Sequence, residues 1–186
     1  MLTDMENDNT MTQMELPSPC PKAQSDYFGP ANFTWLVRGR FGGMPCPGIM
    51  RPAEVDLDAV ARIGLSVVVT LTEEWQPPVP LMRERGIESL YVPIPDMQPP
   101  TLEQAFDTCE TVAKEVAEGK SVVFHCHGGR GRTGTLLAAM LIWYEPDSEA
   151  AIKKVKSINP YWIESDSQLE FLEEFAAEHR KRMGRP

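Results

Sequence analysis

Long apolar runs are missing from this 186-residue sequence. The longest, at 66–71 and 135–143, fall well short of the roughly 20 residues that cross a bilayer. The acidic beginning, MLTDMENDNTMTQMELPSPC, also lacks the basic segment and the following apolar segment of a signal peptide. We therefore expect no membrane span and a cytoplasmic location.

Paired cysteines and an excess of positive charge are missing as well. The four cysteines, Cys20, Cys46, Cys109 and Cys126, show no zinc-like CxxC spacing, and in a chain that is not exported they are expected to be free thiols. The formal net charge is -9 at pH 7. Because nucleic-acid binding needs clustered Lys and Arg, no nucleic-acid partner is expected, and phosphate chemistry would need a local basic pocket.

The composition predicts one globular domain with short extensions. Residues 1–26 are rich in Met, Asp, Asn, Thr and Pro without apolar periodicity, which predicts a flexible acidic arm. The 42% apolar content is enough to bury a core without disulfides or metals. We predict a single domain over residues 27–182 and a tail at 183–186.

Apolar runs alternate with helical patterns along the domain. Helices are expected where an amphipathic pattern follows a capping residue or ends at a glycine, at 56–63, 102–118, 149–157 and from Ser165 onward. Strands are expected at 65–71, 88–94 and 121–125. Uninterrupted apolar strands between helices predict an α/β domain with a mainly parallel sheet flanked by helices, and a site at the carboxyl ends of the strands.

The segment HCHGGRGRTGT, at 125–135, leaves the last of these strands and enters an apolar helix. Its glycines let the backbone curl so that successive N–H groups point inward, which makes an anion-binding nest at the positive end of a helix. A phosphate dianion fits such a nest. The predicted phosphate-binding loop consists of His127, Gly128, Gly129, Arg130, Gly131 and Arg132.

The residue types around this loop indicate nucleophilic chemistry. Cys126 begins the nest among N–H donors, a helix N-terminus and a guanidinium, which all favour thiolate over thiol. Arg132 can grip two phosphate oxygens with its planar fork, and this grip strengthens as charge redistributes in the transition state. We expect Thr133 to donate its hydroxyl to the sulfur and His125 to support the loop from behind.

Phosphoryl transfer to sulfur also needs an acid that protonates the leaving oxygen. Asp96 lies in the proline-rich loop VPIPDMQPPT, directly after the strand 88–94 and so at the same end of the sheet as Cys126. We interpret Asp96 as this acid. A carboxylate that only stiffens a turn between prolines is the alternative.

The signature HC-x-x-G-x-x-R-T resembles that of the cysteine-dependent protein tyrosine phosphatase superfamily. PANFTWLVRGRFGGMP, VVTLTEEW and IPDMQPP resemble segments of its small atypical dual-specificity phosphatases, and the likeness covers roughly residues 29–178. The resemblance implies a cysteine-phosphatase fold, Asp96 as general acid and then general base, and Gln168 as the residue that positions the hydrolytic water. It also implies Glu164 as an auxiliary carboxylate. Gln168 as a mere capping partner of Ser165 stays the alternative.

The sequence thus predicts a tyrosine or dual-specificity protein phosphatase that works through a phosphocysteine intermediate. We expect a monomer that acts on phosphorylated proteins or peptides. His127 and Arg130 resemble in charge the basic loop positions of phosphoinositide-directed relatives, so a phosphatase of phosphoinositides or inositol phosphates is the first alternative. A non-catalytic module that binds phosphorylated residues is the second.

No metal or other cofactor is expected at this loop. Adjacent residues on an extended chain point to opposite faces, so His125, Cys126 and His127 do not converge on one ion, and no distant Cys or His pair completes a tetrahedron. Redox regulation through Cys109 or Cys46 is left open.

Overall fold

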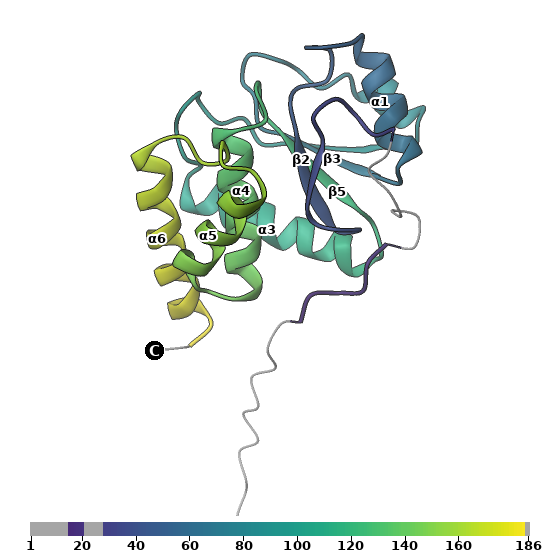
Figure 1. The fold of residues 1–186 in the computed structure, drawn as a ribbon. Helices are drawn as coiled ribbons and strands as arrows, with labels where there is room; N and C mark the ends of the chain where they lie inside the picture. Colours follow the sequence, from purple (N-terminus) through teal and green to yellow (C-terminus); the bar gives the residue numbers. More distant parts are fainter. Residues whose placement is uncertain (1–14, 21–27, 185–186) are drawn as a thin grey trace, which may run out of the picture.

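The structure, a computed structural model, describes residues 15–20 and 28–184 of the chain. In this part of the chain five strands form one sheet in the order β1-β2-β5-β3-β4 (Figure 1). β1 runs antiparallel to β2, and the other neighbouring strands are parallel. The predicted α/β class with a mainly parallel sheet is therefore confirmed. The strands are β1 (Thr34–Val37), β2 (Phe41–Met44), β3 (Val67–Thr70), β4 (Glu88–Tyr91) and β5 (Val122–His125).

Helices connect and cover these strands. They are α1 (Ala53–Arg62), α2 (Val79–Arg83), α3 (Leu102–Ala117), α4 (Gly131–Tyr144), α5 (Ser148–Ile158) and α6 (Asp166–Arg182). Capping boxes form at Thr101 before α3 and at Ser165 before α6, where the sequence predicts helices to begin. The sequence did not predict α2, because five residues are too few to show a helical period. No helix in the described ranges is long and apolar enough to cross a membrane.

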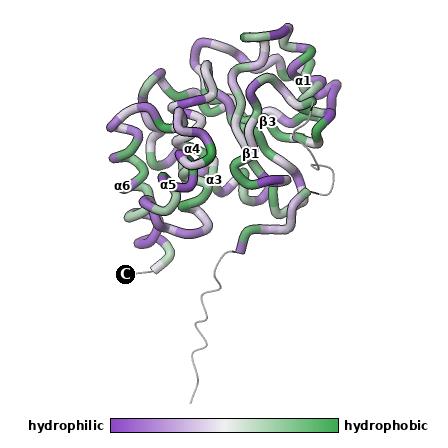
Figure 2. Tube along the Cα trace, viewed as in Figure 1, coloured by the Kyte–Doolittle hydropathy of each residue, from purple (hydrophilic) through white to green (hydrophobic). Residues whose placement is uncertain are grey.

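Each face of the sheet carries its own apolar core, because alternate residues of a strand point to opposite faces. Val67 and Val69 of β3 join the larger core with α3, α4, α5 and α6, whereas Val68 joins the smaller core with α1 and α2. Figure 1 shows α1 on one side of the sheet and α3 to α6 on the other, and Figure 2 shows hydrophobic colouring along β3. Burial on both faces explains why β3 and β5 lack polar alternation.

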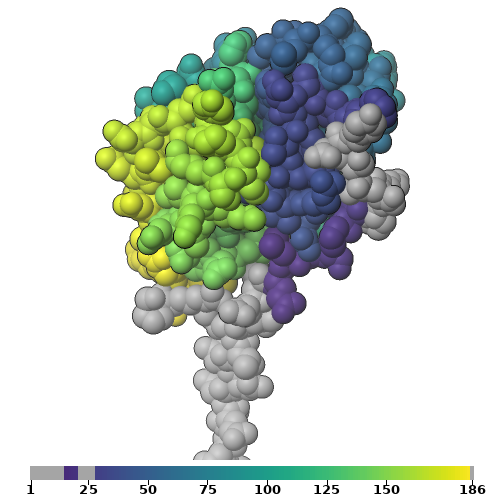
Figure 3. All heavy atoms as spheres, in the orientation of Figure 1, coloured from purple at the N-terminus to yellow at the C-terminus, as the bar shows by residue number. Residues whose placement is uncertain are grey.

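Part of the predicted flexible arm is packed against the domain. Cys20 is buried, and its backbone N–H donates to the carbonyl of Gly39 at 2.8 Å. The Arg40 side chain donates through Nε to the carbonyl of Pro17. Residues 15–20, the purple segment in Figure 3, therefore belong to the folded unit, and the rest of the predicted arm lies outside the described residues.

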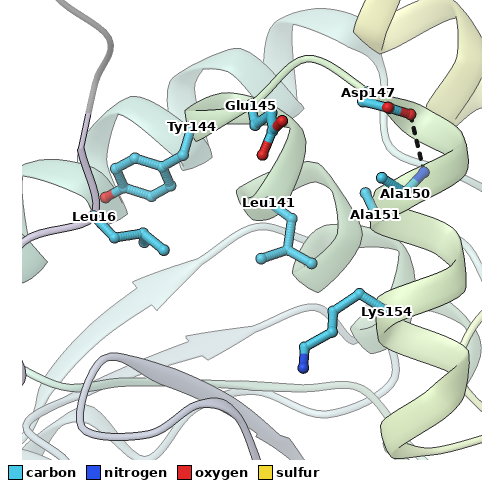
Figure 4. Close-up of a pocket in the computed structure, with 8 residues that line it drawn as sticks. All are labelled: Leu16, Leu141, Tyr144, Glu145, Asp147, Ala150, Ala151 and Lys154. Atoms are coloured by element: carbon cyan, nitrogen blue, oxygen red, sulfur yellow. Dashed lines mark hydrogen bonds between the residues drawn. The ribbon is translucent and has the colours of Figure 1, made fainter.

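This packed segment also closes a cavity of about 240 Å³ at the carboxyl end of α4, the end opposite to the predicted phosphate loop (Figure 4). The buried hydroxyl of Tyr144 has no hydrogen-bond partner in the described part of the chain. Apolar atoms dominate the lining, and the carboxylate of Asp147 is already used to cap α5. The lining residues are Leu16, Leu141, Tyr144, Glu145, Asp147, Ala150, Ala151 and Lys154.

The packing of α4 on the segment before α6 leads to a stability prediction. A Cβ on Gly134 would lie 2.5 Å from Cβ of Trp162 and 2.6 Å from the backbone N of Ile163, distances that force the two segments apart. We expect Gly134→Ala to lower the free energy of unfolding by about 1–3 kcal/mol, measured by urea denaturation. Glu173→Ala, on the exposed face of α6, should change it by less than about 0.5 kcal/mol. Equal stability of both variants would refute the close packing.

Candidate active site

The loop between β5 and α4 is fixed to the end of β2. Gly129 has φ 68°, and a Cβ at this position would lie 2.5 Å from the carbonyl carbon and oxygen of Met44. The backbone N–H of Cys46 donates to the carbonyl of His127 at 2.9 Å, and the indole of Trp162 donates to the carbonyl of Gly129 at 3.0 Å. The predicted nest is therefore a tightly supported loop that needs glycine at its closest contact.

The sulfur of Cys126 lies at the start of this loop and is almost fully buried. The hydroxyl of Thr133, in the first turn of α4, donates to the Cys126 sulfur at 3.1 Å. This is the contact that the sequence predicts for Thr133. A hydrogen-bond donor at the sulfur stabilises negative charge there, which suits both a nucleophilic thiolate and a leaving thiolate.

Two loops, one after β3 and one after β4, hold the guanidinium of Arg132. Glu74, in the loop after β3, accepts from Nη2 at 2.8 Å and from Nη1 at 3.2 Å. Nη1 also donates to the carbonyl of Ile94 at 2.9 Å, and Asp96 Oδ1 lies 3.1 Å from Nη2. Burial opposes the charge of Arg132, but the hydrogen bonds with Glu74 and the negative charges of Cys126, Glu74 and Asp96 outweigh it, and the pKa of Arg132 is raised.

The structure thus brings Asp96 to the predicted site and adds Glu74 as a second carboxylate. Asp96 follows the end of β4, is exposed, and accepts through Oδ1 from the backbone N–H of Met97. From the sequence, Glu74 is expected to be a solvated loop charge after a strand, with a place at the rim of the site as the alternative. The hydrogen bonds from Arg132 lower the pKa of Glu74 to about 2. Glu74 is therefore the residue that fixes one edge of the guanidinium, and Nε of Arg132 makes no hydrogen bond within the described residues.

His125 supports the loop from below, at the end of β5. Its ring nitrogens share hydrogen bonds with the hydroxyl of Thr70, at 2.8 Å, and the carbonyl of Cys126, at 3.2 Å. The ring of Trp75 packs edge-on against it, with 5.3 Å between centroids. Burial lowers the pKa of His125 to about 4, so the imidazole is neutral at neutral pH.

Glu164 and Gln168 lie on the other side of the loop. Glu164 Oε2 accepts from the backbone N–H of Gly131 at 3.0 Å. Gln168 is fully buried, and its Oε1 accepts from the backbone N–H groups of Glu164 and Ser165. Its Nε2 lies 3.4 Å from the carbonyl of Gln98, in the loop that carries Asp96. Gln168 therefore acts as a capping partner and also connects the acid loop to α6; its role toward water stays a prediction.

The pocket above the loop has a volume of about 540 Å³ and is lined by Glu73, Glu74, Asp96 and His127. Arg130, the other basic loop residue, places its guanidinium 5.1 Å from the ring centre of Tyr161. In the described part of the chain no cluster of three or more His, Cys, Asp or Glu side chains is arranged to hold a metal ion.

The remaining cysteines near this region are buried thiols. Burial, followed by the negative charges of Glu74, Cys126 and Asp56, raises the pKa of Cys46 to about 12. Burial also raises the pKa of Cys109, which lies in the larger core. Neither thiol has the lowered pKa of a reactive cysteine. Cys126 is the candidate nucleophile because it begins the loop and its sulfur accepts from Thr133.

Known proteins resemble this chain in sequence and fold. A family model described as a polymorphic toxin system DSP-PTPase phosphatase matches residues 42–146. The phosphatidylglycerophosphate phosphatase PTPMT2 of Arabidopsis thaliana is 30% identical over 129 residues, which cover 67% of this chain and only 57% of that protein. The phosphatidylglycerophosphatase and protein-tyrosine phosphatase 1 of Mus musculus is 29% identical over 168 residues, which cover 81% of this chain and 80% of the relative.

A solved structure, that of Tk-PTP in the active form, superposes with a TM-score of 0.69 at 34% identity, and covers 79% of this chain and 97% of that one. Fold and loop together define a phosphatase of the cysteine-dependent tyrosine and dual-specificity class. Within that class the chain belongs to the DSP-PTPase phosphatase family, whose model matches more than half of its length.

The buried His125 predicts how stability depends on pH. Its pKa is 6.5 when unfolded and about 4 when folded, so between these values the unfolded chain binds a proton that the folded chain does not. The free energy of unfolding should be highest above pH 6.5 and fall by about 3 kcal/mol as pH decreases to 4, measured by urea denaturation. His125→Asn should remove this contribution to the slope of the unfolding free energy against pH, whereas His127→Asn, at an exposed position, should retain it. A slope that persists unchanged in His125→Asn would contradict this assignment.

The contact between Glu74 and Arg132 predicts a kinetic effect. Glu74→Gln keeps the size of the side chain but removes the charge that aligns Arg132, so kcat/KM for an aryl phosphate should fall roughly tenfold and vanadate should bind more weakly. Steady-state kinetics measure kcat/KM, and inhibition by vanadate measures how tightly vanadate binds. Glu173→Gln, which removes the same charge far from the loop, should leave both unchanged. Unchanged or improved vanadate binding in Glu74→Gln would show that Glu74 does not orient Arg132.

Proposed function

We propose that the chain hydrolyses phosphorylated tyrosine, serine or threonine side chains of proteins through a phosphocysteine intermediate on Cys126. The observation that carries this proposal is the distance of 3.1 Å between Asp96 Oδ1 and Arg132 Nη2. It brings an acid and a phosphate-binding guanidinium together at the loop that Cys126 opens. Acid, phosphate grip and nucleophile are the three groups that phosphoryl transfer to sulfur needs.

In the first step the thiolate of Cys126 attacks phosphorus, and the bond from phosphorus to the leaving oxygen breaks. Asp96 gives its proton to that oxygen. Arg132 binds the phosphoryl oxygens with the edge that Glu74 leaves free, and the inward N–H groups of the loop bind the same oxygens. The dephosphorylated side chain then departs.

In the second step water attacks the phosphocysteine, and the bond from sulfur to phosphorus breaks. Asp96, now ionised, accepts the proton from the water. The hydroxyl of Thr133 donates to the sulfur as negative charge returns to it, over the contact of 3.1 Å. Gln168, beside the loop, is the residue we assign to positioning this water. Inorganic phosphate and the thiolate are the products.

The openness of the site supports a broad range of phosphorylated side chains. Asp96 and Glu74 are exposed, and His127 lies at the edge of the same pocket. A placement of Asp96 beside Arg132 would be unnecessary for a module that only binds phosphorylated residues, and so it favours turnover. We further propose that the protein acts as a monomer in the cytoplasm, where free thiols stay reduced.

A second candidate substrate is a lipid or inositol phosphate monoester. His127 and Arg130 are exposed basic positions in the loop, and two relatives carry names that refer to phosphatidylglycerophosphate. The same chemistry at Cys126 would act on such a headgroup. Comparison of kcat/KM for phosphotyrosine peptides and for lipid vesicles distinguishes the two substrates.

The proposed roles of Cys126 and Asp96 predict different kinetic losses. Cys126→Ser should lose at least about 10⁴-fold in kcat, because the nucleophile is gone. Asp96→Asn should lose about 10²- to 10³-fold on a phenyl phosphate and much less on a nitrophenyl phosphate, whose leaving group needs little protonation. Hydrolysis is measured with chelator and reductant present. Activity that survives in Cys126→Ser, or that chelator removes, would refute the thiolate mechanism.

A further inference from the structure

The entrance to the active-site pocket has an uneven distribution of charge. Three of its four lining residues are carboxylates, Glu73, Glu74 and Asp96, and the fourth is His127. Two of these carboxylates share one partner: Glu74 is hydrogen-bonded to Arg132, and Asp96 lies 3.1 Å from the same guanidinium. A single buried cation thus faces two of the three acids.

Glu73 is the acid without a partner. Its side chain is exposed, and its carboxylate makes no hydrogen bond or ion pair with any of the described residues; only its backbone N–H is used, as a donor to Glu74. Arg130, the strongest candidate for a balancing cation, packs over the ring of Tyr161 instead and does not line the pocket. Glu73 is therefore the one carboxylate of this pocket that has no cationic partner among the described residues.

This charge has a direct consequence for substrates. In the proposed mechanism the loop and Arg132 hold the phosphate group, and Glu73 lines the pocket through which the rest of the substrate approaches. A further anionic group there is repelled, whereas a cationic group forms an ion pair. Neighbouring residues of a peptide are 3.8 Å apart, so a Lys or Arg one or two positions from the phosphorylated residue can reach Glu73.

We propose that Glu73 is a specificity-determining residue that selects phosphorylated protein segments with Lys or Arg beside the phosphorylated residue. The inference rests on the proposed function, because it assigns a substrate class to the same site. It also favours basic peptide segments over headgroups that carry several phosphates, since those bring additional negative charge to the acidic side of the pocket.

The test compares phosphotyrosine peptides that differ at one neighbouring position. One carries arginine, one carries citrulline, the uncharged isostere of arginine, and one carries glutamate. For the full chain at low ionic strength we expect kcat/KM for the arginine peptide to exceed that for the citrulline peptide about two- to fivefold, the range of an exposed ion pair. The glutamate peptide should be slower than the citrulline peptide, and added salt should reduce both differences.

The matched variants are Glu73→Gln and Glu173→Gln, which remove one negative charge each, at the pocket and on α6 respectively. In Glu73→Gln the kcat/KM for the arginine peptide, divided by that for the citrulline peptide, should fall to about one. In Glu173→Gln this ratio should stay at the wild-type value. Circular dichroism and thermal unfolding of both variants establish that they are folded.

Two results would overturn this inference. One is an equal kcat/KM of the wild type for all three peptides. The other is a ratio of kcat/KM for the arginine and citrulline peptides that is unchanged in Glu73→Gln. A phosphatidylinositol phosphate vesicle hydrolysed faster than the arginine peptide would also refute the substrate class. A small aryl phosphate, assayed in parallel, separates these failures from failure of the proposed function, since only the latter abolishes its hydrolysis.

Discussion

The guanidinium of Arg132 is a charge inside the protein, and a buried charge without partners would cost several kcal/mol. Glu74, the carbonyl of Ile94 and Asp96 supply those partners from the loops that follow β3 and β4. The carboxyl ends of the parallel strands lie at one edge of the sheet, so these loops reach the first turn of α4 together. The contacts that stabilise Arg132 therefore also bring the acid, Asp96, to the loop of the nucleophile, Cys126.

The phosphate-binding loop depends on backbone contacts as much as on its own glycines. Gly129 lies so close to Met44 that a side chain does not fit, and the indole of Trp162 and the backbone of Cys46 fix two of the loop carbonyls. His125 ties the loop to β3 through Thr70. The carbonyls of His127 and Gly129 are thus held from outside the loop, and a backbone fixed in this way is preorganised to stabilise developing charge on a phosphoryl group.

Sequence patterns predicted those features that local chemistry determines. Strands, capping boxes and the loop that begins at Cys126 depend on short stretches of sequence. Asp96 could be placed at the same edge of the sheet as Cys126 because it directly follows a predicted strand. The contact between Glu74 and Arg132 could not be predicted, because the two residues lie 58 positions apart in the sequence and meet only in the folded chain. The contact of Gln168 with the acid loop, in addition to its capping contact, and the packing of Cys20 could not be predicted for the same reason. Both depend on contacts between distant segments.

The central claim is that catalysis passes through a covalent bond between phosphorus and the Cys126 sulfur. Acid quench of the wild type during turnover, followed by peptide mass spectrometry, tests it most directly. The account predicts one phosphoryl group on the peptide that contains Cys126, with a larger trapped fraction in Asp96→Ala, where the water is activated more slowly. Turnover without any phosphorylated peptide, or with the phosphoryl group on another residue, would contradict it.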